Sequence, residues 1–205
     1  PMIISTGMAN SEEIQEAIEA AREGGCKELA ILHCVSGYPA PAEDYNLRTL
    51  VDMQEKFGLV TGLSDYTTSN LACFGAVALG ASILERHFTD SMDRNGPDIV
   101  NSMDPEALKE LIIGSIELAK MRGGKKEAAK EEQVTIDFAF ATVVTIKPIK
   151  KGGLFTKENI WVKRPGTGQI KAEEYDALLG KVAKKNIGND EHINWIDIDN
   201  TKKEK

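Results

Sequence analysis

Residues 84–98 combine the end of an apolar run with a dense group of ionisable side chains. These side chains belong to Glu85, Arg86, His87, Asp90, Asp93, Arg94 and Asp98. If the run is a β-strand, Glu85 and His87 lie on one face and Arg86 on the other, because strand side chains alternate. A packed strand avoids charge on both faces, whereas a strand end that emerges into water tolerates it. The crowding of charge after the strand favours a functional site over a solvated strand end.

His87 has the chemistry of a metal ligand or of a proton shuttle near neutral pH. A structural histidine is the alternative. A metal needs further ligands, and Asp65, Tyr66 and Asp98 are the candidates at the same end of the predicted strands. A phenol such as that of Tyr66 is an uncommon ligand for a hard divalent cation.

Small hydroxyl side chains end three predicted strands, at Ser5, Ser36 and Ser64. They suit phosphate or carboxylate oxygens, and they equally suit capping of the helices that follow. The two roles are compatible, since both use the N-terminal end of a helix.

Two further residues stand out by context. Tyr38 lies in a Gly-Tyr-Pro turn, where its ring either packs or meets a ligand. Arg164 precedes Pro165 and Gly166, so we expect an exposed and rigid guanidinium that either grips a ligand or is solvated. We interpret His33 as a core residue and assign no role to His192.

Residues 1–122 contain four consecutive strand–helix units. The predicted strands begin near residues 2, 29, 59 and 82. Asn10 with Glu13 forms a capping-box pattern, and Asp104 caps a helix that starts at Pro105. In that last helix Leu108, Leu111, Ile112 and Ile116 form the expected buried stripe.

Alternating strands and helices predict parallel βα units, found both in (β/α)8 barrels and in doubly wound sheets. Because polar residues end every strand, we favour half of a TIM barrel, whose strand ends share one mouth.

Residues 123–134 are charged and predict a linker. Residues 135–200 form a small β-rich domain, with extended runs at 141–146, 152–155 and 160–162 and a helix at 172–179. The tail, 201–205, is expected to be disordered.

The composition of the chain excludes some classes of binding partner. The 205 residues carry a net charge of −7 with no basic cluster before the tail, so we expect no nucleic acid partner. No apolar run is long enough for a membrane span. Cys26, Cys34 and Cys73 lack zinc or redox spacing, which favours reduced thiols and a cytoplasmic location. The chain begins at Pro1 and enters an apolar strand at once, which indicates processing or a piece of something longer.

Ordered motifs along nearly the whole chain resemble one family, the sialic acid synthases together with the legionaminic and pseudaminic acid synthases. The motifs are Ile-Ser-Thr-Gly-Met at 4–8, Leu-His-Cys-Val-Ser-Gly-Tyr-Pro at 32–39, Gly-Leu-Ser-Asp at 62–65, Leu-Glu-Arg-His-Phe-Thr at 84–89, Gly-Pro-Asp at 96–98, Asp-Phe-Ala-Phe-Ala at 137–141 and Trp-Val-Lys-Arg-Pro-Gly at 161–166.

The resemblance implies a fold and a reaction. The fold is the C-terminal half of a (β/α)8 barrel followed by an antifreeze-like SAF domain of the β-clip type, which in a domain-swapped homodimer covers the partner's barrel mouth. The reaction condenses phosphoenolpyruvate with N-acetylmannosamine or a related N-acylated amino sugar, giving a nine-carbon 2-keto acid and phosphate. A divalent metal (Mn, Mg or Co) polarises the sugar aldehyde.

The resemblance also implies residue roles. His87 and Tyr66 match metal positions, and Tyr38 and Asp98 match the reacting centre. The substrate-binding positions are matched by Ser5, Ser36, Ser64, Phe138 and Arg164.

Two departures from the family pattern change the expectation. The family usually has a second metal-binding His where this chain has Tyr66, so weaker metal binding is expected. The family's first four βα units have no counterpart here, so we expect no activity from the isolated chain. It would belong to a longer enzyme, to a split enzyme with a separate N-terminal half-barrel, or to a proteolytic remnant. The alternatives are a noncatalytic carbohydrate-binding or assembly module and an inactive fragment of such an enzyme.

Overall fold

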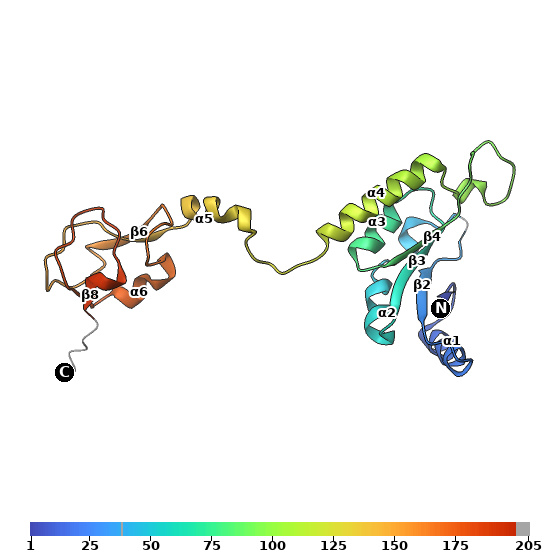
Figure 1. The fold of residues 1–205 in the computed structure, drawn as a ribbon, viewed down its shortest axis with the longest axis horizontal. Helices are drawn as coiled ribbons and strands as arrows, with labels where there is room; N and C mark the ends of the chain where they lie inside the picture. Colours follow the sequence, from blue (N-terminus) through green and yellow to red (C-terminus); the bar gives the residue numbers. More distant parts are fainter. Residues whose placement is uncertain (38, 200–205) are drawn as a thin grey trace. The chain divides into compact units, whose positions relative to one another are not determined.

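A computed structural model describes residues 1–37 and 39–199 and divides the chain into two compact units, with the boundary in the sequence between Lys125 and Lys126 (Figure 1). Each unit is described by itself. The predicted tail, 201–205, lies outside the described residues.

The first unit consists of four strand–helix pairs, as the sequence predicts. Its elements are β1 (Met2–Ser5), α1 (Ser11–Glu23), β2 (Leu29–Cys34), α2 (Thr49–Phe57), β3 (Val60–Asp65), α3 (Leu71–Ala78), β4 (Ile83–Arg86) and α4 (Pro105–Met121). All strand pairs are parallel and the spatial order is β1-β2-β3-β4. A doubly wound sheet reverses its strand order, whereas consecutive barrel strands keep it. The sheet therefore has the sequential order of a half-barrel.

Side chains on one face of this sheet pack against the helices. Ile31 packs with Ile14 and Ile18 of α1, and Leu63 packs with Cys73 of α3 and with Leu111 of α4, in two separate core clusters. Since neighbouring residues of a strand point to opposite faces, Ser64 and the residues in phase with it turn away from the helices. The polar strand ends therefore face the other side of the sheet.

Local signals begin helices α1 and α4 where the sequence predicts. The Asn10 side chain accepts hydrogen bonds from the backbone N–H groups of Glu12 and Glu13, and the Asn10 N–H donates to Glu13 Oε2. Asp104 caps α4 by accepting from the Ala107 N–H at 2.8 Å. These caps satisfy backbone N–H groups that a helix leaves without internal partners.

The predicted buried stripe of α4 is only partly correct. Leu111 is buried and Leu108 is partly buried, but Ile112 and Ile116 are each 52% exposed. Helix α3 covers α4 along one side, where Phe74 lies so close to Gly114 that a Cβ there would meet its ring at 2.5 Å. Within the described residues, no core cluster includes the Ile112 and Ile116 side of the helix.

The second unit is β-rich around one apolar core. Its elements are α5 (Gln133–Ala139), β5 (Thr142–Thr145), β6 (Ile160–Lys163), α6 (Tyr175–Leu178), β7 (Val182–Ala183) and β8 (Ile198–Asp199), and its 3-10 turns include Lys130–Glu132 and Ala172–Glu174. Strands β5 and β6 pair antiparallel, as do β7 and β8. The run expected at 152–155 contributes a single bridge, between Leu154 and Val182, because the chain there turns through Gly152. Helix α5 begins inside the range expected as linker.

Candidate functional site

The outermost strands of the first unit meet through their side chains. The Ser5 hydroxyl of β1 donates a hydrogen bond to Glu85 Oε2 of β4 at 3.1 Å. In a flat sheet three strand spacings would separate β1 from β4 by about 14 Å, more than these two side chains span. The sheet is therefore curled, with Ser5 and Glu85 on its concave face.

A cavity of about 240 Å³ at the ends of β3 and β4 is lined by residues 64–66 and 85–87. The side chains of Asp65 and Arg86 pair with each other on the opposite face of the sheet, whereas those of Ser64, Tyr66, Glu85 and His87 belong to the candidate site. The Tyr66 and His87 rings lie 5.4 Å apart between centroids and are tilted by 59°. His87 Nδ1 lies 3.9 Å from Asp98 Oδ2, an ion pair when the imidazole is protonated. The structure thus brings Ser5, Ser64, Tyr66, His87 and Asp98 to one end of the sheet, with Glu85 among them.

Asp65 does not belong to this group, which corrects its interpretation as a metal ligand. Its side chain is fully buried and engages Tyr45, Cys73 and Arg86 on the helix side of the sheet. The alternation of faces explains the difference: Asp65 is the neighbour of Ser64 in β3, so the two side chains point to opposite faces.

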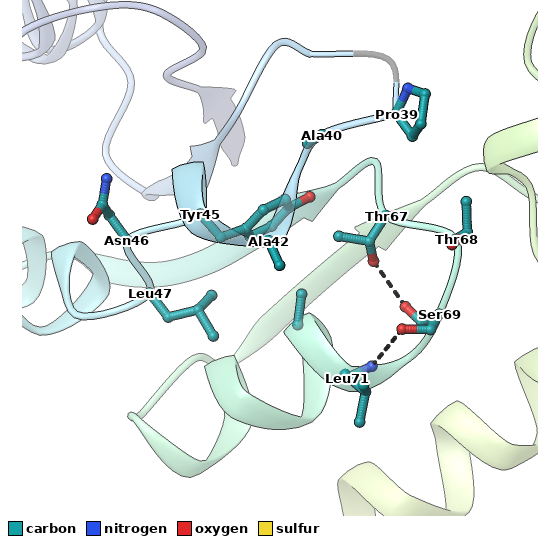
Figure 2. Close-up of a pocket in the computed structure, with 11 residues that line it drawn as sticks. Pro39, Ala40, Ala42, Tyr45, Asn46, Leu47, Thr67, Thr68, Ser69 and Leu71 are labelled. Carbon is teal, nitrogen blue, oxygen red and sulfur yellow. Dashed lines mark hydrogen bonds between the residues drawn. The ribbon is translucent and has the colours of Figure 1, made fainter.

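Ser36 is exposed and lies beside the turn after β1, since a Cβ on Gly7 would stand 3.3 Å from the Ser36 hydroxyl. Tyr38 lies outside the described residues. The loop that continues from Pro39 borders another cavity, of about 620 Å³, whose far wall is formed by Thr67 to Ala72 (Figure 2). That cavity opens against the first turn of α3 and does not include His87.

Phe138 and Arg164 belong to the second unit. Phe138 is 71% exposed on α5, and Arg164 is exposed immediately after β6. The Gly166 N–H donates to the Asp137 carbonyl oxygen at 2.7 Å. The two segments that carry these residues are therefore in contact within their own unit.

The donors near His87 do not form a complete divalent metal site. Among residues 1–37 and 39–199, no three His, Cys, Asp or Glu side chains stand close enough together to hold a metal ion. The phenol at position 66 takes a place at which an imidazole would add a second nitrogen ligand. This donor set does not fit a metal by itself.

Sequence reasoning placed Glu85 in the candidate stretch without giving it a role, and it missed the partners of Asp65. The signal for Glu85 was present, because strand alternation already placed it on the same face as His87. The Tyr45 and Asn70 contacts join residues far apart in the sequence, and no local pattern predicts them.

Comparison with known proteins decides the family. A sequence model described as the NeuB family matches residues 1–127, and a SAF domain model matches residues 140–199. The chain belongs to the NeuB family. The resemblance drawn from the motifs to the sialic acid synthase family is confirmed, and so is the SAF domain.

NeuB family relatives carry the names of sugar acid synthases. The N,N'-diacetyllegionaminic acid synthase of Campylobacter jejuni is 40% identical over 195 residues, which cover 94% of this chain and 58% of that protein. The pseudaminic acid synthase of the same organism is 36% identical over 188 residues, which cover 91% of this chain and 54% of that protein. This chain therefore spans a little over half the length of these relatives.

The fold agrees with a solved structure described as a putative spore coat polysaccharide biosynthesis protein E from Chromobacterium violaceum. The TM-score is 0.78 at 25% identity, with 97% of this chain and 60% of that chain covered. In the part of the chain that the structure describes, no helix is both long and apolar enough to cross a membrane.

Proposed function

We propose that this NeuB family chain forms the C-terminal half of a (β/α)8 barrel and the SAF domain of a sugar acid synthase. The enzyme condenses phosphoenolpyruvate with N-acetylmannosamine or a related N-acylated amino sugar, and a nine-carbon 2-keto acid and phosphate are the products. The observation that carries the proposal is the set of Ser5, Ser64, Glu85 and His87 on one curled sheet end. The synthase names of the relatives support it.

The proposed reaction forms one carbon–carbon bond and breaks the bond between C2 and the phosphate oxygen. The C3 carbon of phosphoenolpyruvate forms a bond to the sugar aldehyde carbon, whose oxygen takes a proton and becomes a hydroxyl. Water adds to C2 and loses one proton, which gives a tetrahedral carbon bearing a hydroxyl and the phosphate oxygen. The C2–O bond to phosphate then breaks, and the hydroxyl loses its proton to become the ketone oxygen. The chain must therefore hold two anionic groups and accept the protons that water releases.

The described side chains divide these tasks. The hydroxyls of Ser36 and Ser64 donate hydrogen bonds to phosphate or carboxylate oxygens of phosphoenolpyruvate, and Ser5 joins them when its hydroxyl turns from Glu85 to the substrate. His87 and Asp98, 3.9 Å apart, form a pair that can hold or pass a proton at the imidazole Nδ1. Tyr38 is proposed to act at the reacting centre with Asp98. No step is assigned to a divalent metal, because the donor set near His87 is incomplete.

We propose that the remaining contacts to phosphoenolpyruvate come from a second half-barrel that docks against β1 and α4. The exposed fractions of Ile3 (56%), Ile112 (52%) and Ile116 (52%) support docking at these two places, because apolar groups gain free energy on burial. In a homodimer, the second unit would bring Phe138 and Arg164 to the sugar bound by the partner subunit.

The test is a phosphate-release assay with the chain alone and with the N-terminal portion of the Campylobacter relative supplied as a separate polypeptide. We expect release only with both polypeptides, phosphoenolpyruvate and the amino sugar, and a product with the mass of the 2-keto acid. Asp98→Asn should abolish release, whereas Asp93→Asn, which changes an exposed carboxylate of the same loop, should not. A complex that assembles and releases no phosphate would overturn the proposal.

A noncatalytic carbohydrate-binding role is the second candidate. The exposed Arg164 and the Trp161–Tyr175 edge-on ring pair of the second unit favour it, because sugars bind to such surfaces by stacking and hydrogen bonding. Tryptophan fluorescence titration of the chain with N-acetylmannosamine, without phosphoenolpyruvate, tests this role. Saturable binding that Trp161→Ala removes, together with no phosphate release from the assembled complex, would favour this candidate.

A further inference from the structure

A buried ion pair stands behind the candidate site, on the opposite face of the sheet. Arg86 Nε lies 3.1 Å from Asp65 Oδ2, and the two side chains are only 2% and 0% exposed. Burying two charges is costly unless the pair also has further hydrogen bonds. The remaining polar atoms of both side chains are accordingly engaged, and both side chains bind the loop after β3.

The Asp65 carboxylate gathers donors from three elements. It accepts from the Tyr45 hydroxyl at 2.5 Å, from the Thr67 N–H at 2.9 Å, from the Thr67 hydroxyl at 3.0 Å and from the Cys73 thiol at 3.3 Å. Burial raises the pKa of the Tyr45 hydroxyl, and the hydrogen bond to Asp65 raises it further. Tyr45 therefore stays protonated and donates to the carboxylate at any ordinary pH.

Tyr45 also reaches the backbone of the site itself. Its oxygen accepts a hydrogen bond from the Tyr66 N–H at 2.8 Å. Thus one hydroxyl joins the Asp65 carboxylate to the peptide that carries the Tyr66 ring. The ring of Tyr66 lies on the other side of the strand, against His87.

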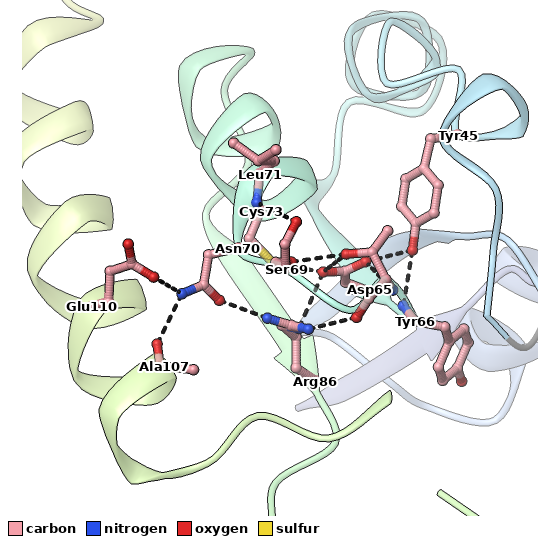
Figure 3. A network of polar contacts seen from close by, with 11 residues as sticks. Tyr45, Asp65, Tyr66, Ser69, Asn70, Leu71, Cys73, Arg86, Ala107 and Glu110 are labelled. Carbon is pink, nitrogen blue, oxygen red and sulfur yellow. Dashed lines mark hydrogen bonds and ion pairs between the residues drawn. The ribbon is translucent and has the colours of Figure 1, made fainter. Parts of the chain in front are cut away.

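Arg86 binds the loop after β3 through both of its terminal nitrogens. Its Nη2 donates to the Thr67 carbonyl oxygen at 2.6 Å and its Nη1 donates to Asn70 Oδ1 at 2.6 Å. Asn70 in turn donates to Glu110 Oε2 at 2.7 Å and to the Ala107 carbonyl oxygen at 2.9 Å, both on α4 (Figure 3). The loop from Tyr66 to Asn70 is therefore tied to α4 through the Asn70 amide, which the Arg86 guanidinium also binds.

We propose that Tyr45, Asp65 and Arg86 are positioning residues that set the Tyr66 ring against the His87 ring. This rests on the proposed function in one respect, since that function gives the Tyr66–His87 cavity its substrate. Arg86 ends β4 and directly precedes His87, and Asp65 ends β3 and directly precedes Tyr66. Each site residue is therefore the chain neighbour of a member of the ion pair, and the pair fixes both peptides from the far face of the sheet.

The contacts distinguish positioning from general stabilisation. A pair that only stabilised the fold would need no bonds to the backbone of the site loop. Here three hydrogen bonds end on backbone atoms of residues 66 and 67, from Tyr45, Asp65 and Arg86. Placement errors of about 1 Å at a reacting group cost on the order of 100-fold in rate, so such bonds have a catalytic consequence.

The decisive variant is Tyr45→Phe, which removes one hydroxyl and keeps the ring in the core. NMR of the full chain with labelled histidine and tyrosine rings reports the ring-current shift that Tyr66 imposes on His87. We expect the His87 ring resonances to move, while those of His192 in the second unit stay in place. Tyr175→Phe removes a comparable hydroxyl in the second unit and should leave His87 unchanged.

Arg86→Lys provides a second variant, because it keeps the charge and loses the two-pronged contact to Thr67 and Asn70. It should also move the His87 resonances. In the two-polypeptide synthase, Tyr45→Phe should lower kcat by about 10-fold or more with little change in the KM for phosphoenolpyruvate. A lower Tm with unchanged Tyr66 and His87 resonances in both variants would overturn the proposal. Moved resonances in a chain that never supports phosphate release would instead count against the proposed function alone.

Discussion

The Tyr66 and His87 rings lie 5.4 Å apart, at a tilt of 59°, where β3 and β4 end side by side. Replacing the phenol by an imidazole at this separation would give two nitrogen ligands to one ion. We predict that Tyr66→His raises the affinity of the chain for Co²⁺ or Mn²⁺ at least about tenfold, or about 1.4 kcal/mol. Calorimetric titration measures it, and Tyr66→Phe is the matched control. Equal metal affinity of Tyr66→His and Tyr66→Phe would show that side chains at positions 66 and 87 cannot bind one metal ion together.

Glu85 is expected to matter for catalysis and not for stability. Its carboxylate is exposed on the concave face and accepts a hydrogen bond from Ser5. Glu85→Ala should lower phosphate release in the assembled synthase by about 100-fold and leave the unfolding midpoint in urea nearly unchanged. Glu16→Ala, on the exposed side of α1, is the control. An equal effect of the two substitutions on activity would contradict the assignment.

Gly114 allows α3 and α4 to pack closely, because it has no side chain at their contact. A Cβ there would stand 2.5 Å from the Phe74 ring. Gly114→Ala should therefore lower the free energy of unfolding by about 1–3 kcal/mol, as overpacking does. Gly123→Ala, where a Cβ would meet nothing within 4 Å, should change it little. Urea denaturation compares the two.

The second unit should lose stability in acid through Asp197. Burial acts to raise the pKa of this carboxyl, but hydrogen bonds from Lys185 and Asn194 outweigh it and leave the pKa below the ordinary 3.8. A lowered folded-state pKa adds stability above pH 3.8, and this stability is lost as the pH falls from there through the folded value. Asp197→Asn should therefore flatten the decline of the unfolding free energy below pH 4. Lys185→Met should flatten it partly, and an unchanged slope in both variants would refute the assignment.

The exposed isoleucines of α4 should govern assembly and not folding. Ile116 is 52% exposed, so Ile116→Glu should leave the Tm of the chain within about 1 °C, given that exposed sites contribute little. The same substitution should prevent complementation by the N-terminal polypeptide, as read by size-exclusion chromatography. Lys120→Glu on the same helix serves as the control for added negative charge.

Local sequence signals predicted the elements of the first unit, because each depends on neighbours in the chain. The cap at Asn10 and the strand alternation at Glu85 and His87 need only short-range rules. Burial of Asp65 was not predictable in this way, since its donors at Tyr45 and Arg86 lie 20 or more residues away. The prediction that Ile112 is buried was wrong for a related reason. Helical periodicity identifies an apolar face but does not tell which element covers it.

Strand β1 pairs with β2 through four residues only, from Met2 to Ser5. A slip of one residue in that register would turn Ser5 toward α1 and bring Ile4 to the concave face. The hydrogen bond from Ser5 to Glu85 would then be lost, although every ionisable group of β4 would keep its place. The geometry of the candidate site therefore depends on the pairing register of a strand only four residues long.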